Sequence, residues 1–233
     1  MGYELVDFTK WKRAEKYNYF TTKEKCVISL TCDVDVTDFV SKCKEEGLNF
    51  YTAFICVLSY TLNAEEYFRY GRDENGNLIL FDYINPFFTD FIAETNDFNC
   101  MTTEYNSDMN ELYNRIARTR EKNKGKEILV PENMTDNMFS ITVLPWVHYR
   151  HLDIIESNLE NMLAPSIAFG KYEEENEKLM MPLTLWVHHA VCDGYHASKF
   201  FSDIENNMSV ILATSLNDDI GSILNNTCKK KKE

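Results

Sequence analysis

The segment that most constrains the fold of this chain is "LMMPLTLWVHHAVCDGYH", residues 179–196. In its first half the residues alternate as in a strand, with Leu183, Leu185 and Val187 on one face. Two histidines and a glycine-containing turn follow, and residues from about 197 to 212 then have the apolar spacing of a helix. The segment therefore predicts a strand, a turn and a helix in direct succession.

Other segments predict further strands and helices without a strict alternation between the two. Residues 26–36 alternate cleanly and predict a half-buried strand, after which Thr37 is expected to N-cap a short helix that Gly47 ends. The remaining predictions are a helix over 52–69, an Asn-Gly turn between two strands at 73–81, strands at 87–92 and 139–146, and an amphipathic helix over 108–123. Such a mixture favours an α/β chain, a two-layer sandwich built on a mixed β-sheet.

The chain is expected to form one domain over residues 1–212, with 213–233 as a C-terminal extension. It contains no repeat, no low-complexity block and no linker rich in Pro, Gly or Ser, and its 44% hydrophobic content is enough for a large core. The extension ends in "KKKKE". We interpret these lysines as a solubilising tail, with contact to lipid or nucleic acid as the alternative.

Composition excludes several classes of protein. A formal charge of −13 disfavours general binding to nucleic acid, which requires basic surface. No run of about 18 apolar residues is present, so a membrane span is not expected, and the N-terminus lacks the apolar region of a secretion signal. The seven cysteines are scattered, odd in number and without a C-x-x-C pair, which is typical of reduced thiols in a cytoplasmic protein.

The histidine cluster "HHAVCDGYH", residues 188–196, allows three interpretations: a metal site, a catalytic base, or a buried strand end. Strand alternation directs His188 and His189 to opposite faces, which weakens a metal site, and no second ligand cluster is evident. A neutral histidine at the end of a strand can act as a base near pH 7. Asp193 could then pin the turn, and Gly194 could supply a backbone conformation that other residues resist. From spacing alone, a histidine with a purely structural role remains open.

The cluster resembles the H-H-x-x-x-D-G signature of the chloramphenicol acetyltransferases, and the dihydrolipoyl acyltransferase cores share H-x-x-x-D-G. "WKRAEKY", "FIAETNDFN", "LPW" and "FGKYEEENEKLMMPLTLWVHH" occur in the same order and at similar spacing as in that family. The resemblance extends to about residue 210. It implies the fold of the CoA-dependent acyltransferases and an O-acetyltransferase that moves an acetyl group from acetyl-CoA to chloramphenicol, an antibiotic-resistance activity.

The resemblance implies four catalytic positions. His189 would be the general base of a direct ternary-complex reaction, with its tautomer held by its own backbone carbonyl. Asp193 would pair with Arg13 in "WKRAEKY" and thereby hold the turn. Thr142 in "SITVLPW" stands where the family usually has the serine that stabilises the oxyanion. Because its extra methyl restricts the rotamer, we expect weaker oxyanion stabilisation.

The resemblance also implies an acceptor pocket and a coenzyme site. Two acceptor positions lack a hydroxyl that the family carries there: Phe20 replaces a tyrosine and Ala168 a threonine. The other acceptor positions match apolar or small residues that could equally be core: Cys26, Ile28, Phe98 and Cys100. Coenzyme contacts are expected at three aromatic positions, the first stacking on adenine and the others lining the pantetheine tunnel: Tyr172, Trp146 and Tyr51.

The resemblance implies a homotrimer in which the base of one subunit faces the acceptor pocket of its neighbour. The opposite directions of His188 and His189 lead us to expect no metal. The three departures at Phe20, Thr142 and Ala168 favour, as one alternative, the same chemistry on a different hydroxyl acceptor. A second alternative is a drug-binding protein without catalysis, and a dihydrolipoyl acyltransferase role is weaker because a lipoyl domain and a flexible linker are absent.

Overall fold

The computed structural model describes residues 2–154 and 163–213, and the side chains of 210–213 are not described. Of the predicted extension, residues 213–233, all but Ala213 therefore lies outside the described residues, including the lysine tail. The elements in chain order are β1 (Tyr3–Leu5), α1 (Ala14–Thr22), β2 (Val27–Asp35), α2 (Thr37–Glu45), α3 (Phe50–Asn63), η1 (Glu66–Phe68), β3 (Tyr70–Arg72), β4 (Leu78–Phe81), β5 (Asn85–Ile92), β6 (Asp97–Thr102), α4 (Met109–Asn123), β7 (Met138–Leu144), β8 (Ser166–Gly170), β9 (Glu173–Glu175), β10 (Lys178–His188) and α5 (Gly194–Ala213).

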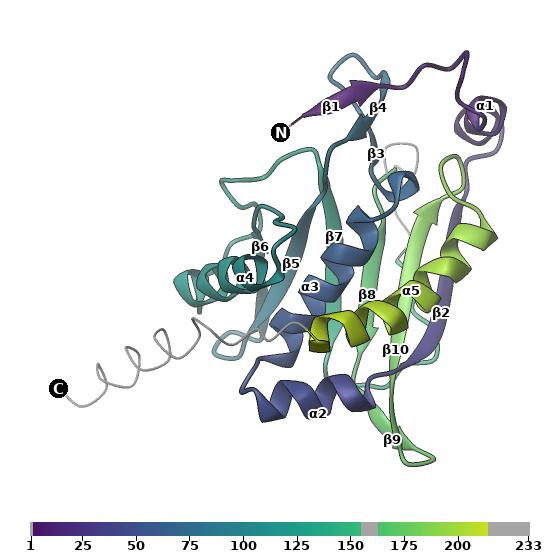
Figure 1. The fold of residues 1–233 in the computed structure, drawn as a ribbon. Coiled ribbons are helices and arrows are strands. Elements are labelled where there is room, and N and C mark those ends of the chain that lie inside the picture. Colours follow the sequence, from purple (N-terminus) through teal and green to yellow (C-terminus); the bar gives the residue numbers. More distant parts are fainter. Residues whose placement is uncertain (1, 155–162, 214–233) are drawn as a thin grey trace.

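A mixed sheet with helices on one face forms the body of the molecule (Figure 1). Its strands follow the order β2-β10-β8-β7-β5-β6, with β9 paired to β10. The pairs β7–β8 and β5–β7 are parallel and the other pairs are antiparallel. Helices α2, α3, α4 and α5 lie together on one side of this sheet. The predicted α/β architecture on a mixed sheet is confirmed.

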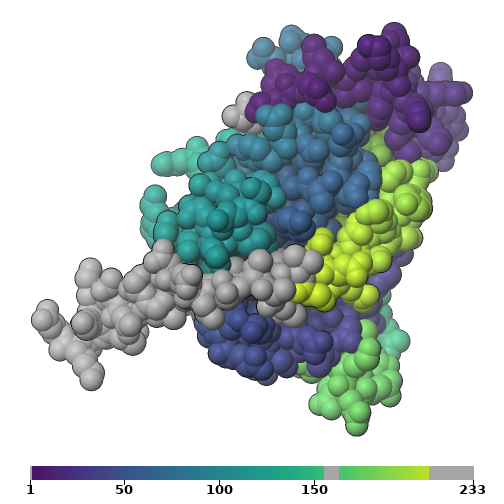
Figure 2. Space-filling model, viewed as in Figure 1, coloured from purple at the N-terminus to yellow at the C-terminus, as the bar shows by residue number. Residues whose placement is uncertain are grey.

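The core lies between this helical layer and the inner face of the sheet. Alternate residues of β10 (Leu183, Leu185 and Val187) point into it, and each is at most 2% exposed. Helix α3 is apolar on nearly all sides and is correspondingly enclosed between α4 and α5 (Figure 2). The sequence segment that reads as continuously apolar is thus the central helix of the layer.

The outer face of the sheet is partly covered by the segment that follows β7. The hydroxyl of Tyr149 donates to the Ala168 carbonyl at 2.8 Å, and the Thr184 hydroxyl donates to the Tyr149 hydroxyl at 3.1 Å. The indole of Trp186 donates to Asp153 at 3.0 Å. Asp153 thus gives the buried Trp186 indole its hydrogen-bond partner, and Tyr149 adds a second partner to Thr184, which also bonds the Thr31 hydroxyl at 2.8 Å.

Several element boundaries differ from the predictions, and three of them concern helices α2, α3 and α5. Helix α3 ends at Asn63, well before residue 69, because the Asn63 side chain bonds the backbone of Ile84 and the chain must turn back to form β3. Thr37 is the first residue of α2 and not its N-cap: the Asp35 carboxylate accepts from the Thr37 amide at 3.0 Å. Helix α5 begins at Gly194 and not near residue 197.

A small second sheet, of order β1-β4-β3, extends from one end of the molecule. The predicted Asn-Gly turn joins β3 to β4, and Gly76 there has φ of +79°, a conformation that glycine adopts without strain. The Asp73 carboxylate accepts the amides of Asn75 and Asn77 and closes the turn. The predicted hairpin at this position is confirmed.

Candidate active site

The two adjacent histidines occupy different environments because β10 ends between them. The His188 side chain is fully buried, and its Nδ1 accepts the amide of Ala190 at 3.0 Å. Burial lowers the pKa of His188, and the charges of Arg72 and His189 lower it further. His189 follows the strand and is partly exposed, and its amide still donates to the Cys26 carbonyl at 3.0 Å. His189 is therefore the histidine that can meet a ligand.

One carbonyl oxygen determines the protonation pattern of the His189 ring. Nδ1 lies 2.8 Å from the Cys192 carbonyl oxygen. Since a carbonyl can only accept, Nδ1 carries the hydrogen, and in the neutral ring Nε2 keeps the lone pair. The resemblance implies that the histidine's own carbonyl holds the tautomer, but here the partner of Nδ1 is the Cys192 carbonyl, and the His189 carbonyl accepts from Arg13 at 2.8 Å.

Arg13 braces the whole turn between β10 and α5. Its guanidinium donates to the carbonyls of His189, Ala190 and Cys192, each at 2.8 Å, and to Asp193 Oδ2 at 3.0 Å. These carbonyls lie where the strand ladder has stopped, so Arg13 replaces the hydrogen bonds that the sheet no longer supplies. Burial raises the pKa of Asp193, but the hydrogen bond from Arg13 and the nearby charges of His196 and Arg13 outweigh it and hold that pKa below its usual value.

The backbone at the glycine of the signature, Gly194, is not in a conformation that only glycine adopts easily. Gly194 is the first residue of α5, and its φ does not fall in the left-handed region. A Cβ placed on Gly194 would meet no atom within 4 Å. The expectation that this position needs glycine for its conformation is therefore wrong. The neighbouring His196 lies with Nδ1 2.8 Å from Asp193 Oδ1 and so adds to the packing of the turn.

Three of the predicted acceptor residues lie at the same end of the sheet as the base. Phe20, in α1, packs its ring on the His189 imidazole with centroids 4.0 Å apart and planes 33° from parallel. Cys26 precedes β2, and its carbonyl accepts the His189 amide. Ile28 pairs with Val187 in the ladder and packs against the core.

The other three acceptor residues lie elsewhere in the chain. Phe98 and Cys100 are on β6, at the opposite edge of the sheet from β2, five strand spacings or about 24 Å away. Phe98 is half exposed, whereas Cys100 is buried. Ala168, on the central strand β8, has no exposed surface. One copy of the chain does not bring the six residues into one pocket.

Thr142 is also remote from the base. The register aligns Thr142 with Ala168, and Ala168 with Thr184 on β10. His189 is five residues further along β10, and β10 is two strands from β7. With a rise of about 3.3 Å per residue and about 4.8 Å between strands, the separation is roughly 20 Å. Within one copy, the Thr142 hydroxyl cannot reach a carbonyl group attacked beside His189.

A cavity of about 1030 Å³ lies between α4, the start of α3 and the ends of β5, β7 and β8. Two of the predicted coenzyme residues, Tyr51 and Tyr172, line it. Trp146 does not line it, but its largely exposed ring packs edge-on against Phe91, a lining residue, with ring centroids 4.9 Å apart. Five cations also line the cavity: Arg118, Arg120, Lys122, Lys124 and Lys171. Arg118 and Lys122 are at exposed positions of α4, where a charged residue is ordinary, so the sequence carries no signal that they line a cavity.

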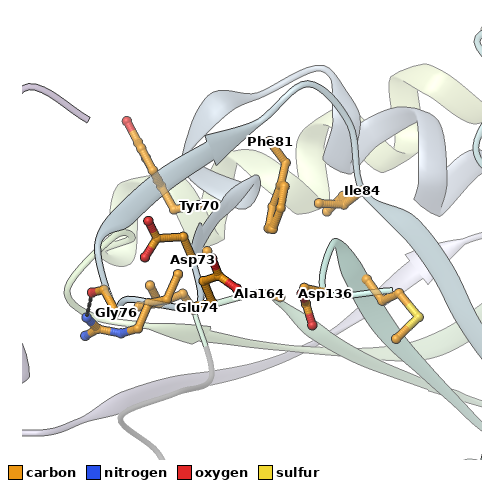
Figure 3. A pocket seen from close by; sticks show the side chains of 12 residues that line it. Tyr70, Asp73, Glu74, Gly76, Phe81, Ile84, Asp136 and Ala164 are labelled. Carbon is orange, nitrogen blue, oxygen red and sulfur yellow. Dashed lines mark hydrogen bonds between the residues drawn. The ribbon is translucent and has the colours of Figure 1, made fainter. Parts of the chain in front are cut away.

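A smaller cavity, of about 410 Å³, lies beneath the β3–β4 hairpin (Figure 3). Tyr70, Asp73 and Glu74 border it from the hairpin side, and Asp136 and Ala164 border the other side. None of the predicted catalytic, acceptor or coenzyme residues lines this cavity. It is therefore separate from the candidate active site.

Across residues 2–154 and 163–213, no three His, Cys, Asp or Glu side chains are grouped so that they could hold a metal ion. No helix within those same ranges is long and apolar enough to span a bilayer.

The family model described as chloramphenicol acetyltransferase matches residues 1–205. The chain belongs to the chloramphenicol acetyltransferase family. A chloramphenicol acetyltransferase of Escherichia coli is 31% identical over 204 residues, which cover 88% of this chain and 93% of that protein. One from Staphylococcus aureus is 32% identical over 206 residues, covering 88% and 95%.

Solved structures confirm the predicted fold. A chloramphenicol acetyltransferase superposes with a TM-score of 0.78 at 21% identity and covers 89% of this chain and all of that one. The dihydrolipoamide acetyltransferase of Azotobacter vinelandii gives a TM-score of 0.63 at 16% identity, covering 90% and 92%. The chain thus shares its fold with the dihydrolipoyl acyltransferase cores, as predicted.

Proposed function

We propose that this protein is an O-acetyltransferase that moves an acetyl group from acetyl-CoA to a hydroxyl of chloramphenicol and so inactivates the antibiotic. The observation that carries the proposal is the hydrogen bond that orients the His189 ring, in a chain that belongs to this family. The His189 Nδ1 is held by the Cys192 carbonyl, which leaves Nε2 to take a proton. Residues 1–212 would form the single catalytic domain, and scattered cysteines without a C-x-x-C pair favour the cytoplasm.

The chain's own groups support a direct transfer. His189 Nε2 takes the proton of the acceptor hydroxyl, whose oxygen attacks the thioester carbonyl carbon. The Thr142 hydroxyl then donates to the developing oxyanion. When the C–S bond breaks, His189 returns its proton to the leaving thiolate, so the imidazole ends neutral. Arg13 and Asp193 take no proton in this scheme and keep the ring in place.

The large cavity supports acetyl-CoA as the donor. It offers Tyr172 for stacking on adenine, and Tyr51 and the Trp146–Phe91 pair beside an elongated chain. CoA carries several phosphate charges, and the cavity gathers cations on a protein whose formal charge is −13. Arg118, Lys122 and Lys124 form no ion pair among the described residues, so they are available to phosphates.

We further propose that the active site is completed by a second copy of the chain in a homotrimer. His189 and Phe20 lie at one end of the molecule, whereas Thr142 is roughly 20 Å away. Phe98 and Cys100 are at the opposite sheet edge. Symmetric association that places the base end of one copy against the Thr142 face of the next would unite the two groups.

The proposal is tested by following thiol release from acetyl-CoA with and without chloramphenicol. Wild-type protein should release thiol only when chloramphenicol is present, and His189→Ala should reduce kcat by roughly 10³-fold or more. His151→Ala, a change at an exposed histidine outside the site, should keep wild-type kcat. Equal rates in His189→Ala and wild type would overturn the assignment of the base.

Phe20 favours a second candidate, the same reaction on a different hydroxyl acceptor. Phe20 has no hydroxyl to offer an acceptor, although its ring stacks directly on the base. A panel of hydroxylated acceptors in the same assay would decide, and a higher kcat/KM for another acceptor would favour this candidate. If cells that express His189→Ala resist chloramphenicol as well as wild type, drug binding without catalysis would explain the protection instead.

A further inference from the structure

Arg120, in α4, uses its whole guanidinium in contacts at the large cavity. Nε and Nη2 form a bidentate pair with the two carboxylate oxygens of Asp90 on β5, at 2.8 and 3.0 Å. Nη1 donates to Asn49 Oδ1 and to Thr52 Oγ1, both at 2.8 Å. Asn49 is the N-cap of α3, and its Oδ1 also accepts the Thr52 amide at 3.0 Å. One side chain thus joins α4, β5 and the start of α3.

The same guanidinium lies over the ring of Tyr51, with Cζ 4.8 Å from the ring centroid. At the other end of that ring, the Tyr51 hydroxyl donates to the Thr89 carbonyl at 2.6 Å. Burial and the Asp90 charge raise the pKa of Tyr51, so its hydroxyl stays protonated and keeps donating. Tyr51 is consequently held at two places, by Arg120 over its ring and by the Thr89 carbonyl at its hydroxyl. A cation over an aromatic face and a bidentate carboxylate pair both restrict the geometry of the groups that they join.

The four residues that Arg120 hydrogen-bonds or overlies all line the cavity: Tyr51, Asn49, Thr52 and Asp90. The contacts close one wall of the cavity where three separate elements meet. The helix offers a comparison in Arg115, which pairs with Glu111 at 2.8 Å but does not line the cavity. The side chains of Arg120 and Arg115 are 25% and 30% exposed, respectively, so exposure does not distinguish the two residues.

We propose that Arg120 is a positioning residue for the acetyl donor: by holding Tyr51 and joining α4, β5 and α3, it keeps the cavity shaped for acetyl-CoA before the donor binds. This inference rests on the proposed use of acetyl-CoA. A preformed wall reduces the ordering that binding must otherwise impose on the protein, so its loss weakens donor binding and leaves acceptor binding unchanged. Arg120 does not take part in proton transfer, because His189 is in the turn that Arg13 braces, outside this network.

The first experiment compares Arg120→Gln with the matched variant Arg115→Gln on the same helix. KM for acetyl-CoA, KM for chloramphenicol and kcat are measured, and the Kd of CoA is measured separately by titration calorimetry. We expect Arg120→Gln to raise the KM of acetyl-CoA and the Kd of CoA roughly tenfold, with KM for chloramphenicol and kcat within about twofold of wild type. Arg120→Lys keeps the positive charge but cannot form the bidentate pair with Asp90, so it should give an intermediate Kd for CoA. Arg115→Gln should match wild type.

The second experiment asks whether Arg120 acts through Tyr51. In a Tyr51→Leu background, Arg120→Gln should raise the Kd of CoA by much less than it does in wild type. An equal increase in both backgrounds would overturn the role of Tyr51. A fall in kcat together with equal rises in both KM values, or an unchanged Kd, would overturn the positioning role of Arg120.

The calorimetric measurement separates this inference from the proposed reaction. If wild type binds CoA but transfers no acetyl group, the proposed reaction fails and the effect of Arg120→Gln on the Kd still decides the inference. If wild type does not bind CoA, both fail. If wild type acetylates chloramphenicol and Arg120→Gln binds CoA equally well, only the inference fails.

Discussion

At the scale of single residues, Arg13 connects the first helix to a turn 176 to 180 residues later in the chain. Its guanidinium reaches three carbonyls and the Asp193 carboxylate at once, which the single ammonium of a lysine cannot do. We therefore expect Arg13→Lys to lower the free energy of unfolding by about 2 kcal/mol and kcat by about tenfold. Urea unfolding and thiol release measure the two effects. Lys12→Ala, at the exposed neighbouring position, is the control, and wild-type kcat in Arg13→Lys would contradict the account.

The buried His188 should make the fold sensitive to mild acid. Burial lowers its pKa below the ordinary 6.5, so the unfolded chain binds a proton more readily than the folded protein. The contribution of neutral His188 to stability is therefore complete above pH 6.5 and is lost as the pH falls below that value, by at most about 1.4 kcal/mol per pH unit. His188→Asn, whose side-chain oxygen can accept the Ala190 amide, should flatten the stability curve between pH 6.5 and 5. An equally steep loss in that variant would argue against the assignment.

At the scale of elements, the end of β8 is packed too tightly for a side chain. A Cβ on Gly170 would lie 2.7 Å from the Val147 carbonyl oxygen and 2.8 Å from Pro182 Cγ. We expect Gly170→Ala to lower the free energy of unfolding by about 1–3 kcal/mol, because the segment that crosses the sheet must shift. Gly194→Ala is the matched control, since its Cβ would meet open space, and its unfolding free energy should equal that of wild type or exceed it slightly. Equal stability of the two variants would contradict this packing.

Sequence patterns predict those helices and strands that have one apolar and one polar face. Alternation marks β2 and β10 to within one residue at most ends, and the amphipathic segment marks α4. The pattern does not predict β8, because four of its five residues are buried and no alternation remains. It also does not predict α1, whose only buried residue is Tyr17, so that no apolar face shows in the sequence. Tertiary contacts, and not local periodicity, define these two elements.

Some residues of the candidate site could likewise be predicted from the sequence, and others could not. The resemblance to the family signature singles out His189 and Asp193, because the residues of that motif are neighbours in sequence, whereas spacing alone left a purely structural histidine open. The carbonyl of Cys192 as the partner of His189 could not be predicted, since the path of the backbone after the strand decides it. The Asp90–Arg120 pair joins a strand to a helix 30 residues later and leaves no pattern in either segment.

At the scale of the whole molecule, the division of the site between two copies can be tested by subunit mixing. His189→Ala removes the base, and Thr142→Glu places a negative charge where the oxyanion would develop, so each variant alone should be inactive. Mixed trimers would contain some interfaces that pair an intact His189 with an intact Thr142. Random mixing of equal amounts should restore about a quarter of wild-type activity. Mixed oligomers of verified composition that remain inactive would contradict a shared site.

The most direct test of the account is the mass spectrum of chloramphenicol after incubation with acetyl-CoA and the protein. With wild type, the account predicts that chloramphenicol gains one acetyl group, carried as an ester on a hydroxyl, and that one CoA thiol is released for each ester formed. With His189→Ala, chloramphenicol should stay unmodified over the same period. Unmodified chloramphenicol with wild type, or equal acetylation with His189→Ala, would contradict the central claim.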